Sequence, residues 1–309
     1  MVDILIPTYN RAHTILESID SALNQVNVKV NVHVIDNNSS DDTLLLIKRN
    51  YSKQKNLFLH EFDDTVPMYM NWNRCLPYIK SKYFKFLFSD DLLSADFCFE
   101  CLKVLEENDT VDLIATDLNY FEDNINYVGK IRKYNKNGLY NGKKIIFRSL
   151  LTRNNISAPS NSLIRSLRLN STNFTSNRVA TDWIFFADIL YNNSGNLNYC
   201  YLEKPLAYFR TSGLTETNEL KISADWIILN YEARRKMSMI FSNYQRWLIR
   251  ILSLSYCSIV LVFIRKKSST EYSKARDYLR NQSLWFPILF LLISLLMRID
   301  RVEKMLWSK

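Results

Sequence analysis

Residues 4–11 read Ile-Leu-Ile-Pro-Thr-Tyr-Asn-Arg, an apolar strand that Pro7 stops and that gives way to a polar turn. Apolar side chains then recur at helical spacing, and an alternating, valine-rich strand follows them. The same succession continues along the chain, and its further elements are expected at residues 14–25, 28–35, 57–59 and 84–88. We therefore predict an α/β fold with a mostly parallel central sheet flanked by helices.

Three of the predicted strands end in polar or acidic turns, at residues 7–11, 36–43 and 89–91. In open parallel sheets, ligands bind beyond the carboxyl ends of the strands. We therefore expect these three turns to converge on one binding site.

Asp36 and the adjacent pair Asp90 and Asp91 each follow a predicted strand. Neighbouring carboxylates repel each other unless a cation or hydrogen bonds compensate the repulsion. Mn²⁺ or Mg²⁺ supplies that compensation, because both ions favour carboxylates combined with substrate phosphates. A solvated acidic helix start is the alternative for an isolated Asp-Asp pair. The position after the apolar run 84–88, beside two other polar turns, favours the metal.

Four motifs in order make the first 100 residues or so resemble the family 2 glycosyltransferases of the Rossmann-like GT-A fold. The likeness is looser beyond residue 120. It implies transfer of a sugar from a nucleotide diphosphate, with Mn²⁺ or Mg²⁺ as the cofactor. The motifs are residues 4–11, residues 21–25 (Ser-Ala-Leu-Asn-Gln), residues 34–43 (Val-Ile-Asp-Asn-Asn-Ser-Ser-Asp-Asp-Thr), and the run from Asn71-Trp72-Asn73 to residues 86–93.

The resemblance also implies roles for single residues. Asp91 would bind the metal, and Asp90 would contact the ribose or metal-bound water. The family often has an acidic residue where Phe88 stands, which leaves the division of labour between Asp90 and Asp91 open. Arg210 would lie near the diphosphate, where arginine suits bidentate phosphate contact, or would be a surface arginine. The donor-binding set is Pro7, Tyr9, Arg11, Asp36, Asp90 and Arg210. Of these, Pro7, Tyr9 and Asp36 would hold the nucleotide base.

Asp182 is the candidate general base, because an inverting transferase must deprotonate the acceptor hydroxyl opposite the leaving phosphate. In the family this residue is an aspartate just before an aromatic-rich helix, often preceded by glutamate, which Thr181 replaces here. A carboxylate at a helix start is the alternative. Candidates for the acceptor side of the site are Asn161, Ser162 and Trp183.

The character of the sequence changes after Phe209. We predict a catalytic domain at residues 1–215, with the nucleotide sugar bound by 1–100 and the acceptor by 101–215, and a helical membrane-associating region at 216–309. A basic, helix-like run at 220–250 precedes two apolar segments, 247–264 and 284–297, each too short to span a bilayer comfortably. Short apolar segments flanked by basic residues suit an anionic membrane surface; a soluble helical subdomain or a homo-oligomer contact is the alternative.

The expected function is thus that of an inverting hexosyltransferase acting from UDP-hexose. The expected acceptor is a lipid-linked, polyprenyl diphosphate saccharide of a bacterial surface polysaccharide such as O-antigen or capsule. A dTDP-rhamnose-dependent rhamnosyltransferase, a nucleotidyltransferase and a non-catalytic membrane-bound scaffold are the alternatives. The first strand lacks the glycine-rich loop that a nucleotidyltransferase would need.

Composition and the amino-terminus complete the expectation. The formal net charge of +9 suits an anionic partner, but no motif for binding nucleic acid accompanies it. The amino-terminus carries no leader pattern, which predicts a cytoplasmic protein, peripheral on the inner face of the plasma membrane. Cys98 and Cys101 form an isolated Cys-x-x-Cys pair, which we interpret as two reduced, buried thiols.

Overall fold

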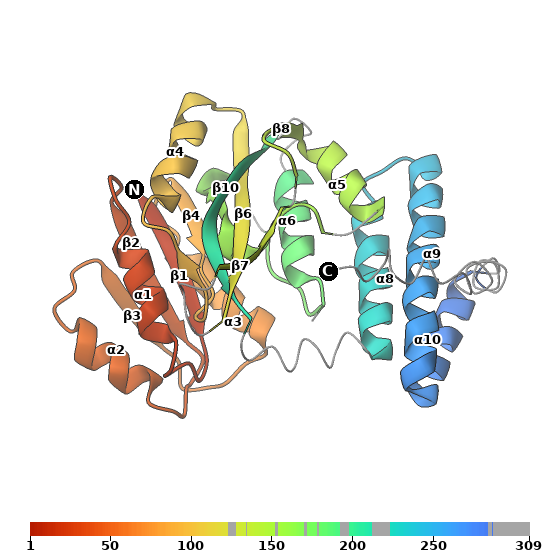
Figure 1. Cartoon of the computed structure of the whole chain (residues 1–309), viewed down its shortest axis with the longest axis horizontal. Helices are drawn as coiled ribbons and strands as arrows, with labels where there is room; N and C mark the ends of the chain where they lie inside the picture. Colours follow the sequence, from red (N-terminus) through yellow and green to blue (C-terminus); the bar gives the residue numbers. More distant parts are fainter. Residues whose placement is uncertain are drawn as a thin grey trace. The chain divides into compact units, whose positions relative to one another are not determined.

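The computed structural model describes residues 1–122, 128–133, 135–151, 154–169, 172–177, 179–191, 198–211, 223–283 and 286. The chain divides into two compact units, one of residues 1–176 with 181–212 and one of residues 177–180 with 213–309 (Figure 1). The first unit holds the sheet, and the second is helical.

The sheet of the first unit is mixed rather than mostly parallel. Its strand order is β3-β2-β1-β4-β9-β6-β10-β5, with β7 paired to β6 and β8 paired to β10. Of the nine pairings among the described strands, four are parallel. The strands are β1 (Val2–Thr8), β2 (Val30–Asp36), β3 (Leu57–Glu61), β4 (Tyr83–Phe86), β5 (Leu92–Leu93), β6 (Val111–Phe121), β7 (Val128–Arg132), β8 (Gly138–Asn141), β9 (Ser162–Arg165) and β10 (Asn198–Arg210).

The predicted parallel order holds from β3 to β4, whereas beyond β4 only the β6–β10 pairing of the described strands is parallel. Helical crossovers join the first four strands, and such crossovers produce parallel neighbours. The short β6–β7 connection admits only an antiparallel pairing, and β9 lies antiparallel to both β4 and β6.

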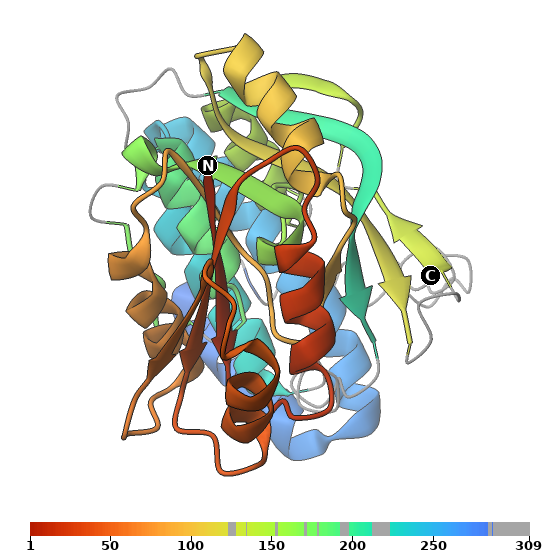
Figure 2. The same cartoon turned by 90° about the vertical axis from the view of Figure 1, so that its left-hand side faces the viewer.

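The helices of the first unit pack their apolar faces on this sheet, whose strand β1 is buried along its whole length. Figure 2 shows α1 in front of the amino-terminal strands. The Gln25 side chain joins the end of α1 to the start of α4 by donating to Ser94 and accepting from the Cys98 N–H. The helices are α1 (Ile15–Leu23), α2 (Thr43–Tyr51), α3 (Met68–Cys75), α4 (Phe97–Glu107), α5 (Gly142–Leu151) and α6 (Thr181–Tyr191), with 3₁₀ turns at Leu76–Tyr78, Pro159–Asn161 and Ser166–Arg168.

The second unit contains α8 (Ala224–Ser238), α9 (Asn243–Lys267) and α10 (Ser269–Gln282), packed around a buried apolar cluster. The helix-like run predicted at 220–250 is therefore two helices. The Ser242 hydroxyl accepts from the Gln245 N–H and the Gln245 side chain accepts from the Ser242 N–H, a capping box that starts α9.

None of the helices in the described part of the chain is long and apolar enough to cross a membrane. The predicted apolar segment at 284–297 lies outside the described residues except for Phe286. The five cysteines, all of them described, are free and buried, which confirms the interpretation of Cys98 and Cys101 as buried thiols.

Candidate active site

The polar turns after β1 and β2 are tied together by hydrogen bonds. The main-chain N–H of Asn10 donates to the Ser39 hydroxyl at 2.9 Å, and that of Arg11 donates to the Thr43 hydroxyl at 2.8 Å. Asn10 has φ 51°, a left-handed conformation that asparagine tolerates better than most residues. Much of the polar motif at 36–43 thus serves to hold the β1–α1 turn in place.

Asp36 ends β2 and faces inward. It has no exposed surface, and both of its carboxylate oxygens accept from Ser39, from the N–H at 2.8 Å and from the hydroxyl at 2.5 Å. Pro7 is buried beside it in register with Ile35, whereas Tyr9 is 44% exposed. Of the three residues predicted to hold the nucleotide base, only Tyr9 presents a surface to solvent in this state.

The acidic pair after β4 divides into one outward and one inward carboxylate. The Asp90 side chain is 35% exposed and lies 3.8 Å from Nε of Arg11. Asp91 is 1% exposed, and its carboxylate accepts from the Ser160 hydroxyl at 2.5 Å and from the Arg210 N–H at 3.1 Å. Burial, and next the charge of Asp90, raises the pKa of Asp91. The exposed carboxylate is therefore that of Asp90, whereas the buried carboxylate of Asp91 holds the turn through its hydrogen bonds to Ser160 and Arg210.

Helix α1 holds the same turn through its polar face. The Thr14 hydroxyl donates to the carbonyl oxygen of Ser89, and the Ser18 hydroxyl donates to that of Asp91, both at 2.8 Å. Ser18 is fully buried, although it lies on the apolar side of an amphipathic helix. Its burial is thus explained by the main-chain oxygen that it satisfies.

Arg210, at the end of β10, is buried and therefore is not the surface arginine that was the alternative prediction. Its guanidinium group already has partners within the fold. Its Nε donates to the carbonyl oxygen of Asp90 at 3.0 Å, and its guanidinium forms an ion pair with Glu17 of α1. The guanidinium also lies 4.5 Å from the ring centroid of Phe121 and is 6% exposed. These contacts position the acidic turn, and the predicted diphosphate contact of Arg210 stays a prediction.

Ser160 and Lys85 form a buried support under the acidic turn. Nζ of Lys85 donates to the Ser160 carbonyl oxygen at 2.6 Å and lies 3.6 Å from the Phe97 ring centroid. Burial lowers the pKa of Lys85 to about 7. Neither residue was predicted to belong to the site; the available signal was a lysine inside an otherwise apolar strand.

Asp182 opens α6 and is partly buried. Burial raises its pKa to about 6, and the charge of Arg132 on β7 opposes that rise. Helix α6 is fixed to β4 through aromatic rings: Phe185 stacks on Phe174 at 3.9 Å, and Phe174 meets Phe86 edge-on at 5.1 Å. A carboxylate with such a pKa is ionised at neutral pH and still basic enough to accept a proton.

The three predicted acceptor residues are buried. Asn161 is inside the fold, where its amide donates to the Thr116 carbonyl oxygen and accepts from the Ala158 N–H. Ser162 donates to the Pro159 carbonyl oxygen, and Nε1 of Trp183 donates to the Ser149 hydroxyl at 3.0 Å. These side chains are only 0 to 3% exposed, so they do not form the predicted acceptor surface in this structure. We now predict that they stabilise the core.

The family of the chain follows from comparison with known sequences. Residues 3–167 match the model of Glycosyl transferase family 2, and this range is more than half of the 309 residues. The chain belongs to glycosyl transferase family 2.

Curated relatives of this family 2 chain align with parts of it. A stretch of 219 residues is 28% identical to an uncharacterized glycosyltransferase of Rickettsia felis, covering 70% of this chain and 34% of that protein. A stretch of 116 residues is 31% identical to the chondroitin synthase of Pasteurella multocida, covering 38% of this chain and 12% of that protein. The chain thus spans about a third or less of these relatives.

Solved structures support the fold of the family 2 chain. S. aureus TarS in complex with UDP-GlcNAc superimposes with a TM-score of 0.68 at 18% identity, covering 89% of this chain and 78% of the other. The mannosyltransferase PcManGT of Pyrobaculum calidifontis, in complex with GDP-Man and Mn²⁺, gives 0.57 at 14% identity, covering 100% and 87%. These likenesses show a GT-A-like α/β fold.

Phe88, the departure from the common acidic family 2 motif, has a packing role. Its ring stacks on Trp72 with the centroids 4.7 Å apart, and Trp72 in turn meets Phe174 edge-on at 5.1 Å. Asn73 holds Phe174 through hydrogen bonds to both its N–H and its carbonyl oxygen. The aromatic residue thus belongs to the layer that joins β4 to the segment before α6.

Proposed function

We propose that this family 2 chain is an inverting, metal-dependent hexosyltransferase that uses a UDP-hexose. The observation that carries the proposal is the acidic turn after β4, which exposes Asp90 while Asp91, Arg210 and Ser160 fix its backbone. A turn held this rigidly suits a carboxylate that must be preorganised for a charged ligand.

The residues present fit a cation that shares its ligands with the donor. Among the described residues there is no group of three or more His, Cys, Asp or Glu side chains that could hold a metal alone. Mg²⁺ is bound by one or two carboxylates plus substrate phosphates, for which Asp90 suffices. Of the two residues predicted to bind the metal, Asp91 and Asp90, we therefore assign the metal to Asp90, because Asp91 is buried. When bound, the cation would neutralise the charge of the leaving diphosphate.

Asp182 would accept the proton of the acceptor hydroxyl as that oxygen attacks the anomeric carbon. Its position on a helix fixed to β4 by stacked rings keeps the carboxylate in place relative to the strand that leads to Asp90. Arg132 lies close enough to favour the ionised form, so it would keep the base deprotonated at neutral pH.

Tyr9 and Asp36 would recognise the base of the donor. Tyr9 offers an exposed ring for packing, and Asp36 would accept from the ring N–H through a lone pair that its two hydrogen bonds from Ser39 do not use. Arg11, paired with Asp90, would lie near the donor phosphates. The UDP-GlcNAc of the TarS complex supports a uridine donor.

The proposed acceptor is a lipid-diphosphate-linked saccharide of a bacterial surface polysaccharide, reached by peripheral attachment to the inner face of the plasma membrane. The net charge of +9 and the exposed aromatic side chains of α9 support this proposal. The similarity to the chondroitin synthase of Pasteurella multocida also supports a polysaccharide acceptor.

A thermal-shift panel tests the donor. We expect UDP-hexoses with Mn²⁺ to raise the melting temperature by mass action, and Mn²⁺ or nucleotide alone to do so less. Stabilisation by dTDP-rhamnose or GDP-mannose instead would replace UDP-hexose as the donor. The absence of any shift with all nucleotide sugars would favour a non-catalytic scaffold.

A further inference from the structure

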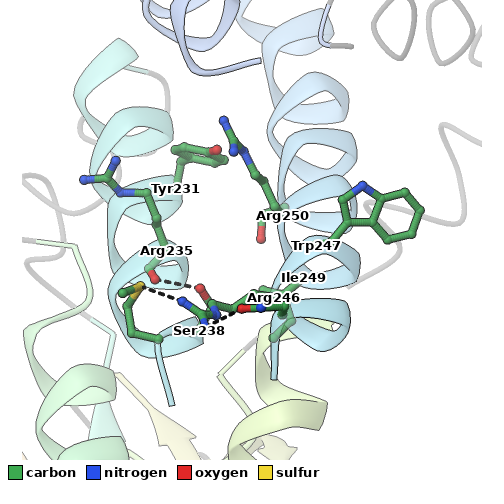
Figure 3. Close-up of a pocket in the computed structure, with 10 residues that line it drawn as sticks. Tyr231, Arg235, Ser238, Arg246, Trp247, Ile249 and Arg250 are labelled. Carbon is green, nitrogen blue, oxygen red and sulfur yellow. Dashed lines mark hydrogen bonds between the residues drawn. The ribbon is translucent and has the colours of Figure 1, made fainter. Parts of the chain in front are cut away.

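The second unit contains a pocket of about 360 Å³ between α8 and α9 (Figure 3). All of its lining residues belong to these two helices and to the turn that joins them, so the pocket is formed within one unit. It is separate from Asp90 and Asp182, which belong to the first unit.

The pocket is cationic. Arg235, Arg246 and Arg250 line it, and no acidic residue does. None of these arginines takes part in an ion pair within the described part of the chain. Figure 3 shows the Arg250 side chain beside Tyr231, between the helices, while Arg235 extends along the outside of α8. Uncompensated guanidinium groups favour an anion, and they match phosphate by forked hydrogen bonds.

Two buried polar atoms in the pocket, Nε of Arg246 and the hydroxyl of Ser253, lack a hydrogen-bond partner. Ser253 is only 1% exposed. The Tyr231 hydroxyl, also buried, interacts with Arg250. A buried donor without an acceptor costs about 1–3 kcal/mol, so such groups point to a ligand that supplies acceptors.

The remaining hydrogen bonds of the arginines go to neutral groups. One terminal nitrogen of Arg246 donates to the Asn243 side-chain oxygen at 2.7 Å, and one of Arg250 donates to the carbonyl oxygen of Gln282 at the end of α10. Neutral partners orient the guanidinium groups without cancelling their charge. The pocket is thus arranged for an anion with several acceptor oxygens.

Aromatic side chains beside the pocket suggest where that anion is carried. Trp247 is 55% exposed and stacks on Tyr244, which is 72% exposed, with the ring centroids 6.2 Å apart. Met239, in the turn before α9, is also exposed. Tryptophan and tyrosine with exposed rings next to arginine are typical of the headgroup level of a membrane.

We propose that this pocket binds the phosphate group of an anionic lipid headgroup, with Arg246, Arg250 and Ser253 as donors and with Trp247 and Tyr244 lying at the membrane surface. The site deepens the proposed membrane attachment, on which it rests, and it uses none of the residues assigned to sugar transfer.

Sedimentation of the full chain with vesicles tests the proposal. Phosphatidylcholine vesicles with phosphatidylglycerol should bind the protein, whereas vesicles carrying oleate as the anion should bind it more weakly, because a planar carboxylate lacks the tetrahedral set of oxygens of a phosphodiester. The double variant Arg246→Gln, Arg250→Gln should lose about tenfold or more in affinity for the phosphatidylglycerol vesicles. The matched control is Lys274→Gln with Arg276→Gln, which removes two exposed charges from α10 and should change affinity much less.

Competition by inorganic diphosphate and comparison with the control variant complete the test. Inorganic diphosphate should compete with the vesicles for wild-type protein, which needs no variant to fold. Equal loss in the control, or wild-type affinity in the pocket variant, would overturn the proposal. Diphosphate binding that leaves vesicle binding unchanged would assign the pocket to a free phosphate compound and would overturn the lipid.

Discussion

Nε of Arg210 donates to the main-chain carbonyl oxygen of Asp90 at 3.0 Å, across 120 residues of sequence. The N–H of the same arginine donates to the carboxylate of Asp91 at 3.1 Å, and its guanidinium pairs with Glu17. One residue of β10 therefore fixes both members of the acidic pair and joins them to α1.

Replacing Arg210 by lysine should lower turnover and stability together. Lysine cannot donate to Asp90 and Glu17 from a planar fork, and a buried hydrogen-bonded position lost in this way costs about 1–3 kcal/mol. Urea denaturation and steady-state kinetics measure the two effects, and Glu17→Gln should reproduce part of both. If Arg210→Lys weakens donor binding while the unfolding midpoint stays unchanged, Arg210 contacts the diphosphate as first predicted.

The first hundred residues were the predictable part of the fold. Strands such as Val30–Asp36 alternate cleanly, and their polar ends mark the site, so local pattern sufficed. The mixed part of the sheet beyond β4 could not be derived in this way, because the pairing of β9 with β4 and β6 depends on contacts distant in sequence. The capping box of Ser242 and Gln245 could have predicted the break between α8 and α9, but this signal was missed.

The site residues also differ in how far local sequence pattern could predict them. Asp90 and Asp182 could be proposed as site residues from their positions, after a strand and at the start of a helix, and their roles stay predictions. Whether Asp91, Asn161 or Trp183 faces ligand or core depends on partners such as Ser160 and Ser149, which no local pattern reveals.

The pH dependence of turnover tests Asp182 as the base. Its pKa is raised to about 6, so the carboxyl group is protonated and inactive below that pH and ionised above it. We expect kcat/KM to rise through about pH 6 and to level off near neutrality. Arg132→Gln removes a charge that lowers this pKa, so the rise should move to higher pH.

A flat profile between pH 5 and 8 would contradict the role of Asp182. Asp182→Asn provides the complementary measurement: turnover should fall by about 10²–10⁴-fold while donor affinity, measured by calorimetry, stays nearly the same. Wild-type turnover in this variant would place the base elsewhere.

Substitutions at Asn161 and Trp183 should affect stability rather than acceptor use. Asn161→Ala leaves the Ala158 N–H and the Thr116 carbonyl oxygen without their partner, and should cost about 1–3 kcal/mol. Trp183→Phe removes the hydrogen bond to Ser149 and should cost about 1 kcal/mol. Thermal unfolding gives these values, and an acceptor KM that rises with no loss of stability would restore the acceptor role.

Calorimetric titration of UDP into wild type, Asp90→Asn and Asp91→Asn, each in Mn²⁺ and in EDTA, tests the central claim most directly. We expect the wild type to bind UDP far more tightly in Mn²⁺ than in EDTA. Asp90→Asn should lose that difference, whereas Asp91→Asn should retain it in whatever fraction of the protein stays folded, because Asp91 is buried beneath the turn. A difference that survives Asp90→Asn and disappears only in folded Asp91→Asn would return the metal to Asp91. Equal UDP affinity in Mn²⁺ and EDTA for wild-type protein would contradict the metal-dependent account.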